Sequence, residues 1–205
     1  LTASQQALEA GESFDLLVEA YDAYRNPYVQ QTNSALQLVD SAGGISSSQA
    51  QLGSTGTVFV NGLSLEKVGE PVELTVRQLG LDLGSLLFTV QHASIDHLHV
   101  ELERSWAWVG EPSELTVVAR DVYENPVLTF NESVQLSSSS GGFISQTVSG
   151  FQNALLTSQV TWDGVSLGDQ ISASATSASG SSHLIDALSN SCQGPPSSVF
   201  EFVAS

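Results

Sequence analysis

The sequence predicts an all-β fold arranged as two tandem β-sandwiches. Three observations lead to this prediction: an internal repeat, apolar residues that alternate along short segments, and a composition suited to strands and turns. The 205 residues include 17 Gly but no Met and only 5 Lys plus Arg. A chain of this length accommodates two domains of ordinary size. Cys192 is the only cysteine, so each sandwich depends on an apolar core and not on internal disulfides.

The internal repeat decides the domain organisation. Residues 35–38 match residues 133–136 after a slip of one position, and a larger set of pairs recurs 99 positions apart. These pairs are Gly11 and Gly110, Glu12 and Glu111, Leu16 and Leu115, Val18 and Val117, Ala20 and Ala119, Gly69 and Gly168, Val72 and Ile171, Leu74 and Ala173, and Val76 and Ala175. We therefore predict domain 1 at residues 1–96 and domain 2 at residues 97–205.

Alternating apolar residues predict the strands. Phe14, Leu16 and Val18 are separated by single residues, which is the period of a strand with one face buried. Short runs of this kind, divided by Gly, Ser, Asn and Pro, are typical of two antiparallel sheets packed face to face. The last strand of copy one, residues 86–90, resembles residues 199–203. That match predicts an inserted loop near residues 183–196 of domain 2, with either a binding role or none.

The charge of the chain limits its partners. The formal net charge is -17, and each half is acidic, with 11 acidic and 3 basic residues in 1–97 and 11 and 2 in 98–205. Such a field repels phosphate backbones and anionic lipids, so we expect neither nucleic acid binding nor direct membrane insertion. The sequence contains no run of eighteen apolar residues and no basic-plus-apolar leader. From its start at Leu1 we expect the chain to be part of a longer protein.

One motif is present in both copies. Copy one contains Ala-Tyr-Asp-Ala-Tyr-Arg-Asn-Pro at 20–27, and copy two contains Ala-Arg-Asp-Val-Tyr-Glu-Asn-Pro at 119–126, preceded by Ala-Ser-Ile-Asp-His-Leu at 93–98. These segments resemble the bacterial immunoglobulin-like repeats of invasin- and intimin-type surface adhesins, over nearly the whole chain. The resemblance implies two immunoglobulin-like Greek-key sandwiches at a cell surface. Arg25 and Glu124 occupy a position that is commonly Gly in the family, which predicts a turn that does not require a positive φ.

The Asp-x-Tyr-x-Asn-Pro motif also has a direct physical interpretation. The Asp can accept N–H bonds from the turn that follows it, which makes the motif a structural corner. Its residues are Asp22, Tyr24, Asn26 and Pro27 in copy one and Asp121, Tyr123, Asn125 and Pro126 in copy two. The alternative hypothesis is a calcium site, because Asp22, Asn26 and Asp96 offer hard oxygen ligands near domain ends.

Other residues are candidates for binding. Trp106 and Trp108 share one face of a predicted strand, where copy one has Ala7 and Glu9, so the fold does not require large rings there. An exposed aromatic pair can contact a protein or a sugar ring, although capping of the local core is the simpler interpretation. His183 and Asp186 fall in the predicted loop. His97 and His99 share a strand face and suggest zinc more weakly.

No catalytic motif is found: the sequence lacks a Gly-x-Ser-x-Gly elbow, a His-Glu-x-x-His pair and a phosphate loop. We expect no enzyme activity and no cofactor, calcium aside. The favoured function is a semi-rigid spacer in a large extracellular or cell-surface protein, with neighbouring immunoglobulin-like modules as partners. Direct adhesion to a protein or glycan is one alternative, and an accessory role beside a secreted hydrolase is the other.

Overall fold

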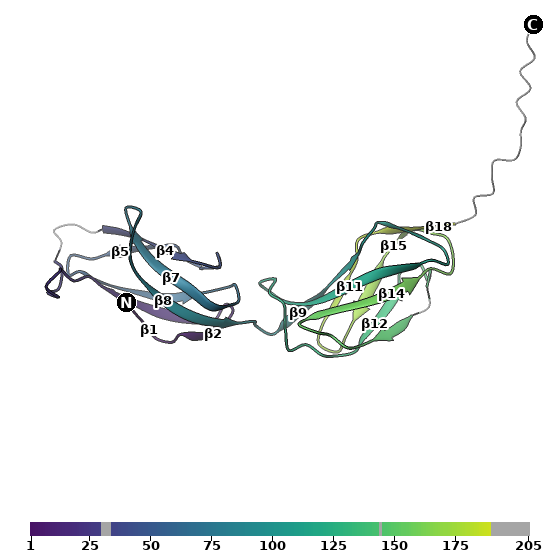
Figure 1. The fold of residues 1–205 in the computed structure, drawn as a ribbon, viewed down its shortest axis with the longest axis horizontal. Coiled ribbons are helices and arrows are strands. Elements are labelled where there is room, and N and C mark those ends of the chain that lie inside the picture. The colour runs from purple at the N-terminus through teal and green to yellow at the C-terminus, as the bar shows by residue number, and fades with distance from the viewer. Residues whose placement is uncertain (30–33, 144, 190–205) are drawn as a thin grey trace, which may run out of the picture. The chain divides into compact units, whose positions relative to one another are not determined.

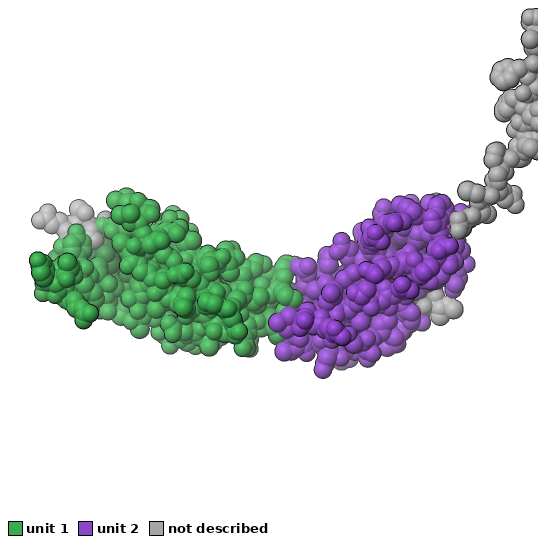
Figure 2. All heavy atoms as spheres, viewed as in Figure 1, with its two compact units in different colours: residues 1–94, 121–127 green, residues 95–120, 128–205 purple. Residues whose placement is uncertain are grey.

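The chain folds into two compact units without a helix among the residues described. The computed structural model describes residues 1–29, 34–143 and 145–189 (Figure 1). Unit 1 comprises Leu1–Ser94 together with Asp121–Val127, and unit 2 comprises Ile95–Arg120 and Leu128–Ser205 (Figure 2). The chain therefore passes between the units at three points, 94–95, 120–121 and 127–128.

Unit 1 is a sandwich of two sheets. Its sheets have the strand orders β1-β3-β6 and β2-β8-β7-β4-β5. The crossovers from β3 to β4 and from β6 to β7 pass from one sheet to the other, as in a Greek-key immunoglobulin-like fold. The strands are β1 Thr2–Ala3, β2 Ala7–Glu9, β3 Ser13–Glu19, β4 Ser34–Asp40, β5 Gln49–Leu52, β6 Thr57–Ser64, β7 Gly69–Gln78 and β8 Leu81–Gln91.

The core of unit 1 forms because each strand buries alternate residues. Along β3, Phe14, Leu16 and Val18 are buried while their neighbours are partly or fully exposed. The Phe14 ring meets Phe88 of the other sheet at a centroid distance of 4.9 Å. Each fully buried side chain of this size stabilises the fold by roughly 1.5–3 kcal/mol. The predicted stripes thus supply the contact between the two sheets.

Unit 2 repeats this architecture, except that its second sheet is divided into two. Its sheets have the orders β14-β11-β9, β10-β18-β15 and β13-β12-β16-β17, and the last two together correspond to the sheet β2-β8-β7-β4-β5 of unit 1. Strand β11 pairs with β14 as β3 pairs with β6, and β10 runs parallel to β18 as β2 runs parallel to β8. The strands are β9 Ile95–Leu102, β10 Trp106–Trp108, β11 Pro112–Asp121, β12 Val134–Ser138, β13 Gln146–Val148, β14 Leu155–Thr161, β15 Ser166–Asp169, β16 Ile171–Ser174, β17 Ser179–Ser181 and β18 Ile185–Leu188.

The strand pairing corrects the spacing of the repeat. Asp40 pairs with Leu74 in unit 1, and the equivalent Ser138 pairs with Ile171 in unit 2. Leu74 therefore corresponds to Ile171, 97 positions away, and the predicted spacing of 99 is wrong for the second half of each copy. A slip of two residues returns every side chain to the same face. The alternation of apolar residues therefore hides it.

The same shift corrects the predicted inserted loop. Val72 pairs with Phe88 in unit 1, and Asp169 pairs with Ile185 in unit 2. Strand β18 of unit 2 is therefore equivalent to the end of β8 in unit 1. Residues 185–188 are thus a strand with Ile185 and Ala187 fully buried, and the prediction of a loop is wrong for them. Residues 190–205, which include Cys192 and the segment 199–203, lie outside the described residues.

Candidate functional site

The Asp-x-Tyr-x-Asn-Pro motif forms the same corner twice. In the first corner, Asp22 Oδ1 accepts the N–H groups of Tyr24 and Asn26, both at 2.8 Å, and Asn26 Nδ2 donates to Asp22 Oδ2 at 3.0 Å. In the second corner, Asp121 accepts the equivalent three bonds from Tyr123 and Asn125 at 2.8–2.9 Å. Each motif therefore closes its own turn with side chains.

The prediction that these turns do not require a positive φ is wrong. Arg25 has a φ of 67° and Glu124 a φ of 66°, so both residues adopt the left-handed conformation that Gly adopts without strain. The Asp carboxylate accepts hydrogen bonds from the N–H groups on both sides of this residue, one from the Tyr before it and one from the Asn after it. These bonds hold the turn in a conformation that the Arg or Glu side chain alone disfavours.

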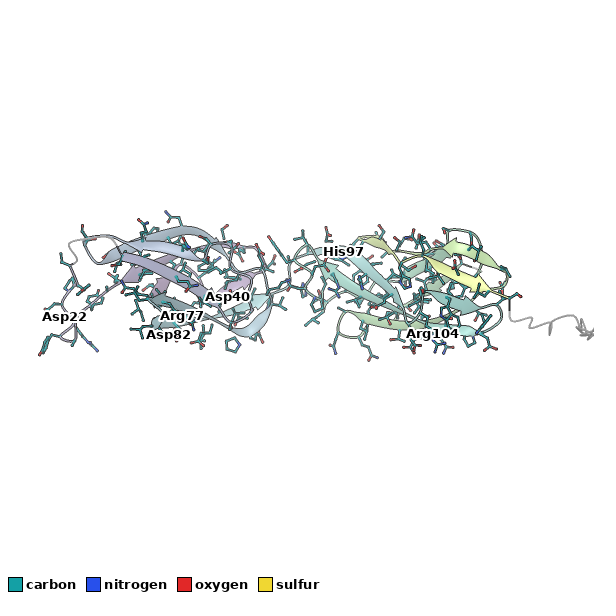
Figure 3. All side chains as sticks on the ribbon, turned by 90° about the horizontal axis from the view of Figure 1, so that it is seen from above. Asp22, Asp40, Arg77, Asp82, His97 and Arg104 are labelled. Atoms are coloured by element: carbon teal, nitrogen blue, oxygen red, sulfur yellow. The ribbon has the colours of Figure 1, made fainter. Side chains whose placement is uncertain are left out.

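The two corners differ in burial. Asp121 is 0% and Asn125 3% exposed, whereas all described residues from Tyr21 to Val29 are exposed and Tyr24 is 87% exposed. Figure 3 shows Asp22 on a loop that leaves the strands of unit 1. The identical hydrogen bonds therefore form in water in one corner and away from water in the other.

The buried corner is held by residues of unit 1. Asn125 Nδ2 donates to the Glu66 carbonyl at 2.7 Å, and the Val68 N–H donates to Asn125 Oδ1 at 3.3 Å. The Lys67 ammonium donates to the Tyr123 carbonyl, and Tyr123 packs against the apolar core of unit 1. Segment Asp121–Val127 thus belongs to unit 1 by its contacts, although the sequence repeat places it in the second copy.

The environment of Asp121 favours its charged form. Burial alone raises the pKa of this carboxyl, but N–H bonds from Asn125, Ala93 and Tyr123 outweigh it and lower the pKa below the usual value. The Ala93 N–H donates to Asp121 Oδ2 at 3.0 Å. Asp22 also has a lowered pKa, chiefly through the Asn26 side chain and backbone.

The calcium candidates are engaged in hydrogen bonds. Asp22 and Asn26 bond to each other as described, and Asp96 accepts a bond from His97 Nδ1 at 3.0 Å. Within the described parts of the chain, no three His, Cys, Asp or Glu residues are grouped so that they could hold a metal ion. Calcium binding by Asp22, Asn26 and Asp96 stays a prediction, and melting with calcium and with a chelator tests it.

The tryptophan pair lies on the outer face of unit 2. Trp106 and Trp108 are 38% and 37% exposed, while Ala107 between them is buried. Their ring centroids are 5.6 Å apart at 69°, and the Arg104 guanidinium lies 5.1 Å from the Trp106 centroid. Both rings line a pocket of about 350 Å³ with Arg104, Glu111 and Glu114; Figure 3 labels Arg104 on this unit. An amphipathic pocket of this type can take a polar ligand with a flat face.

The structure brings Asp186 and His183 to the same region. Asp186 pairs directly with Trp106 across β18 and β10, and its carboxylate accepts the Gly168 N–H at 2.8 Å. His183 Nε2 lies 3.4 Å from the Arg104 carbonyl oxygen. The four predicted binding residues therefore come from adjacent segments. Sequence reasoning missed Arg104, which only its place two residues before Trp106 could have indicated.

Sequence reasoning also missed Asp169, the central acid of unit 2. Its carboxylate is fully buried and accepts bonds from Trp162 Nε1 at 2.9 Å, Ser138 Oγ at 2.7 Å and the Ser140 N–H at 3.0 Å. Burial raises the pKa of this carboxyl, but these donors lower it far more, so it remains charged. The acid ties β15 to the turn after β12, and no motif in the sequence indicates this role.

The sequence matches no protein-family model and no curated protein. Among solved structures, the D0-D1 domain of intimin is 15% identical, with 91% of this chain and 96% of that chain covered and a TM-score of 0.36. FdeC, an Escherichia coli adhesin, is 16% identical, with 91% and 62% covered and a TM-score of 0.44. A β-glycosidase from Bacteroides vulgatus is 12% identical, with 86% and 23% covered and a TM-score of 0.41.

These likenesses concern the fold. Among the described residues no helix has the length and apolar character needed to span a membrane. The chain is a pair of immunoglobulin-like β-sandwiches, as its own strand order shows.

Proposed function

We propose that the chain is a non-enzymatic spacer in a large extracellular or cell-surface protein, where its two immunoglobulin-like units present other domains. The observation that carries the proposal is the assignment of Asp121–Val127 to unit 1. A spacer transmits position only if its units resist bending. We expect three chain passages, with Asp121–Val127 held by unit 1, to restrain bending more than a single flexible linker does.

The contacts of the second corner supply the restraint in this proposal. Asn125 bonds to Glu66 and Val68, and Asp121 bonds to Ala93. Separation of the corner from these partners would break all three bonds. The bond from Ala93 to the Asp121 carboxylate contributes about 1.5–3 kcal/mol and each neutral bond of Asn125 about 0.5–1.5 kcal/mol, so we expect the corner to open rarely.

Small-angle X-ray scattering of the wild-type chain and two matched variants tests this proposal. We expect Asn125→Ala to broaden the distribution of interatomic distances, because it removes the bonds to Glu66 and Val68. Asn26→Ala changes the same motif in the exposed corner and serves as the control, with no broadening expected. Equal distributions for the wild type and Asn125→Ala would contradict the spacer proposal.

The tryptophan pocket favours adhesion as a second candidate function. Trp106 and Trp108 present an exposed aromatic surface, and the pocket that they line also contains Arg104 and three glutamates, Glu103, Glu111 and Glu114. Flat rings beside polar groups suit a glycan. A glycan array tests adhesion through this pocket. The array is probed with the wild type, with the double variant Trp106→Ala plus Trp108→Ala, and with Phe59→Ala, which removes an exposed ring of unit 1 and serves as the control. Signal that the tryptophan variant retains, or no signal from the wild type, would contradict adhesion through this pocket.

A further inference from the structure

The first corner of the chain exposes the groups that its twin uses for binding. Asn125 bonds to the Glu66 carbonyl and to the Val68 N–H, and the Tyr123 ring covers Gly11, where an added Cβ would collide with Tyr123 Oη. Asn26 and Tyr24 occupy the same positions of an identical turn, but both are exposed to solvent. The first corner therefore has the same turn as the second. Its Asn and Tyr side chains are exposed to solvent, whereas those of the second corner contact unit 1.

The surface that receives the second corner also has a counterpart. In unit 1 the Gly11 N–H donates to the Leu65 carbonyl at 2.9 Å, and in unit 2 the Gly110 N–H donates to the Trp162 carbonyl at 2.9 Å. Trp162 therefore stands where Leu65 stands. The residues that follow, Asp163–Val165, correspond to the receiving residues Glu66–Val68.

This counterpart surface is open to solvent. Asp163 and Gly164 are exposed and Val165 is 61% exposed. An added Cβ at Gly110 would meet no atom within 4 Å among those described, in contrast to Gly11. Unit 2 thus presents the backbone groups and the space that unit 1 uses to hold Asn125 and Tyr123.

We propose that the corner Asp22–Pro27 docks on the Gly110 and Asp163–Val165 surface of unit 2 of a second copy of this chain, joined to it head to tail. Asn26 Nδ2 then donates to the Asp163 carbonyl, the Val165 N–H donates to Asn26 Oδ1, and the Tyr24 ring covers Gly110. This inference rests on the proposed spacer function and names its partner, which is a second copy of this chain.

The docked state is weaker than its twin within unit 1. Gly164 replaces Lys67, so the bond from a lysine ammonium to the tyrosine carbonyl is missing. The copies are also acidic and repel each other at low salt. A covalent connection compensates for both effects, because a short linker raises the effective concentration to the order of 1 mM.

A tandem fusion of the chain tests the docking. In the fusion, residues 1–188 of the first copy come first, residues 92–99 follow as the linker, and residues 1–205 of the second copy come last. The linker has the same length and sequence as the segment that joins the two units within one chain. Segmental ¹⁵N labelling of the first copy lets NMR follow the exchange of its Val165 amide alone. We expect this exchange to slow by about tenfold or more relative to the single chain, because a docked amide exchanges only when the contact opens.

Two variants of the second copy make the test specific. Asn26→Ala should restore the fast exchange of Val165, and its exposed position leaves the fold intact, which far-UV circular dichroism checks. Asn125→Ala should leave the slow exchange of Val165 unchanged. Equal Val165 exchange in the fusion and the single chain would overturn the docking. The spacer proposal would still stand if scattering shows that Asn125→Ala loosens the single chain.

Discussion

The corners Asp22–Pro27 and Asp121–Pro126 have the same turn in opposite environments. In both corners one Asp carboxylate accepts hydrogen bonds from two backbone N–H groups and from the Asn side chain, and a charged residue has a positive φ. Only in the second corner are the Asp and the Asn buried, where the turn contacts Glu66, Lys67 and Val68 of unit 1. The motif therefore determines the local turn, whereas its surroundings determine how much the same bonds stabilise the folded chain.

The largest expected difference concerns the two aspartates. Asp121→Ala leaves the N–H groups of Ala93, Tyr123 and Asn125 without their acceptor, and we expect a loss of about 2–4 kcal/mol in the free energy of unfolding. The donors exposed by Asp22→Ala bond to water, so a smaller change is expected. Urea unfolding followed by far-UV circular dichroism measures both, and equal losses would contradict the role of burial.

The two equivalent glycines give the next largest difference. Gly11 and Gly110 have φ values of 80° and 83°, so an Ala at either position costs about 1–2 kcal/mol in backbone strain. At Gly11 the new methyl group also displaces the Tyr123 ring, and overpacking of this kind adds about 1–3 kcal/mol. The melting temperature of Gly11→Ala should be lower than that of Gly110→Ala. The reverse order of melting temperatures would show that Tyr123 does not cover Gly11.

The two asparagines should differ by less. Asn125→Ala removes the acceptor of the Val68 N–H and the donor to the Glu66 carbonyl, for an expected loss of about 1–3 kcal/mol. Amide exchange at Val68 should accelerate in Asn125→Ala and remain unchanged in Asn26→Ala. An unchanged Val68 exchange in both variants would exclude the contact of Asn125 with this amide.

The smallest expected effect is a dependence on pH. The pKa of Asp121 is lower in the folded chain than the ordinary value near 4, so its stabilisation is complete above about pH 4 and is lost as the pH falls through the folded pKa. Asp121→Asn should be less stable at neutral pH and should lose less stability on acidification. Identical acid profiles for both proteins would contradict this contribution. The tryptophans, all in unit 2, allow the acid response of Asp169 to be followed separately by fluorescence.

Alternation of side chains predicted the fold but not the register. The stripe Phe14, Leu16 and Val18 indicated β3 and its sandwich, because each buried face needs an apolar residue at every second position. The match of residues 86–90 to 199–203 was misleading. Ile185 and Ala187 form the equivalent strand, and four residues leave too short a pattern to recognise.

The corners were predicted in part. The motif indicated that Asp22 and Asp121 accept hydrogen bonds from N–H groups of the turn that follows, because an Asp at this place bonds to its local backbone. The positive φ of Arg25 and Glu124 was missed, since side-chain bonds and not residue preference impose it. The burial of Asn125 was also hidden, because its partners Glu66 and Val68 lie far away in sequence and only the fold brings them together.

Residual dipolar couplings of the backbone amides show whether the contacts of Asp121–Val127 with unit 1 fix the two units to each other. If Asp121–Val127 is held by unit 1, the couplings of residues 1–94 and of residues 128–189 should fit one alignment tensor with a single magnitude. Asn125→Ala should reduce the magnitude for one unit relative to the other, and Asn26→Ala should not. Tensors of clearly different magnitude for the two units in the wild-type chain would contradict the account.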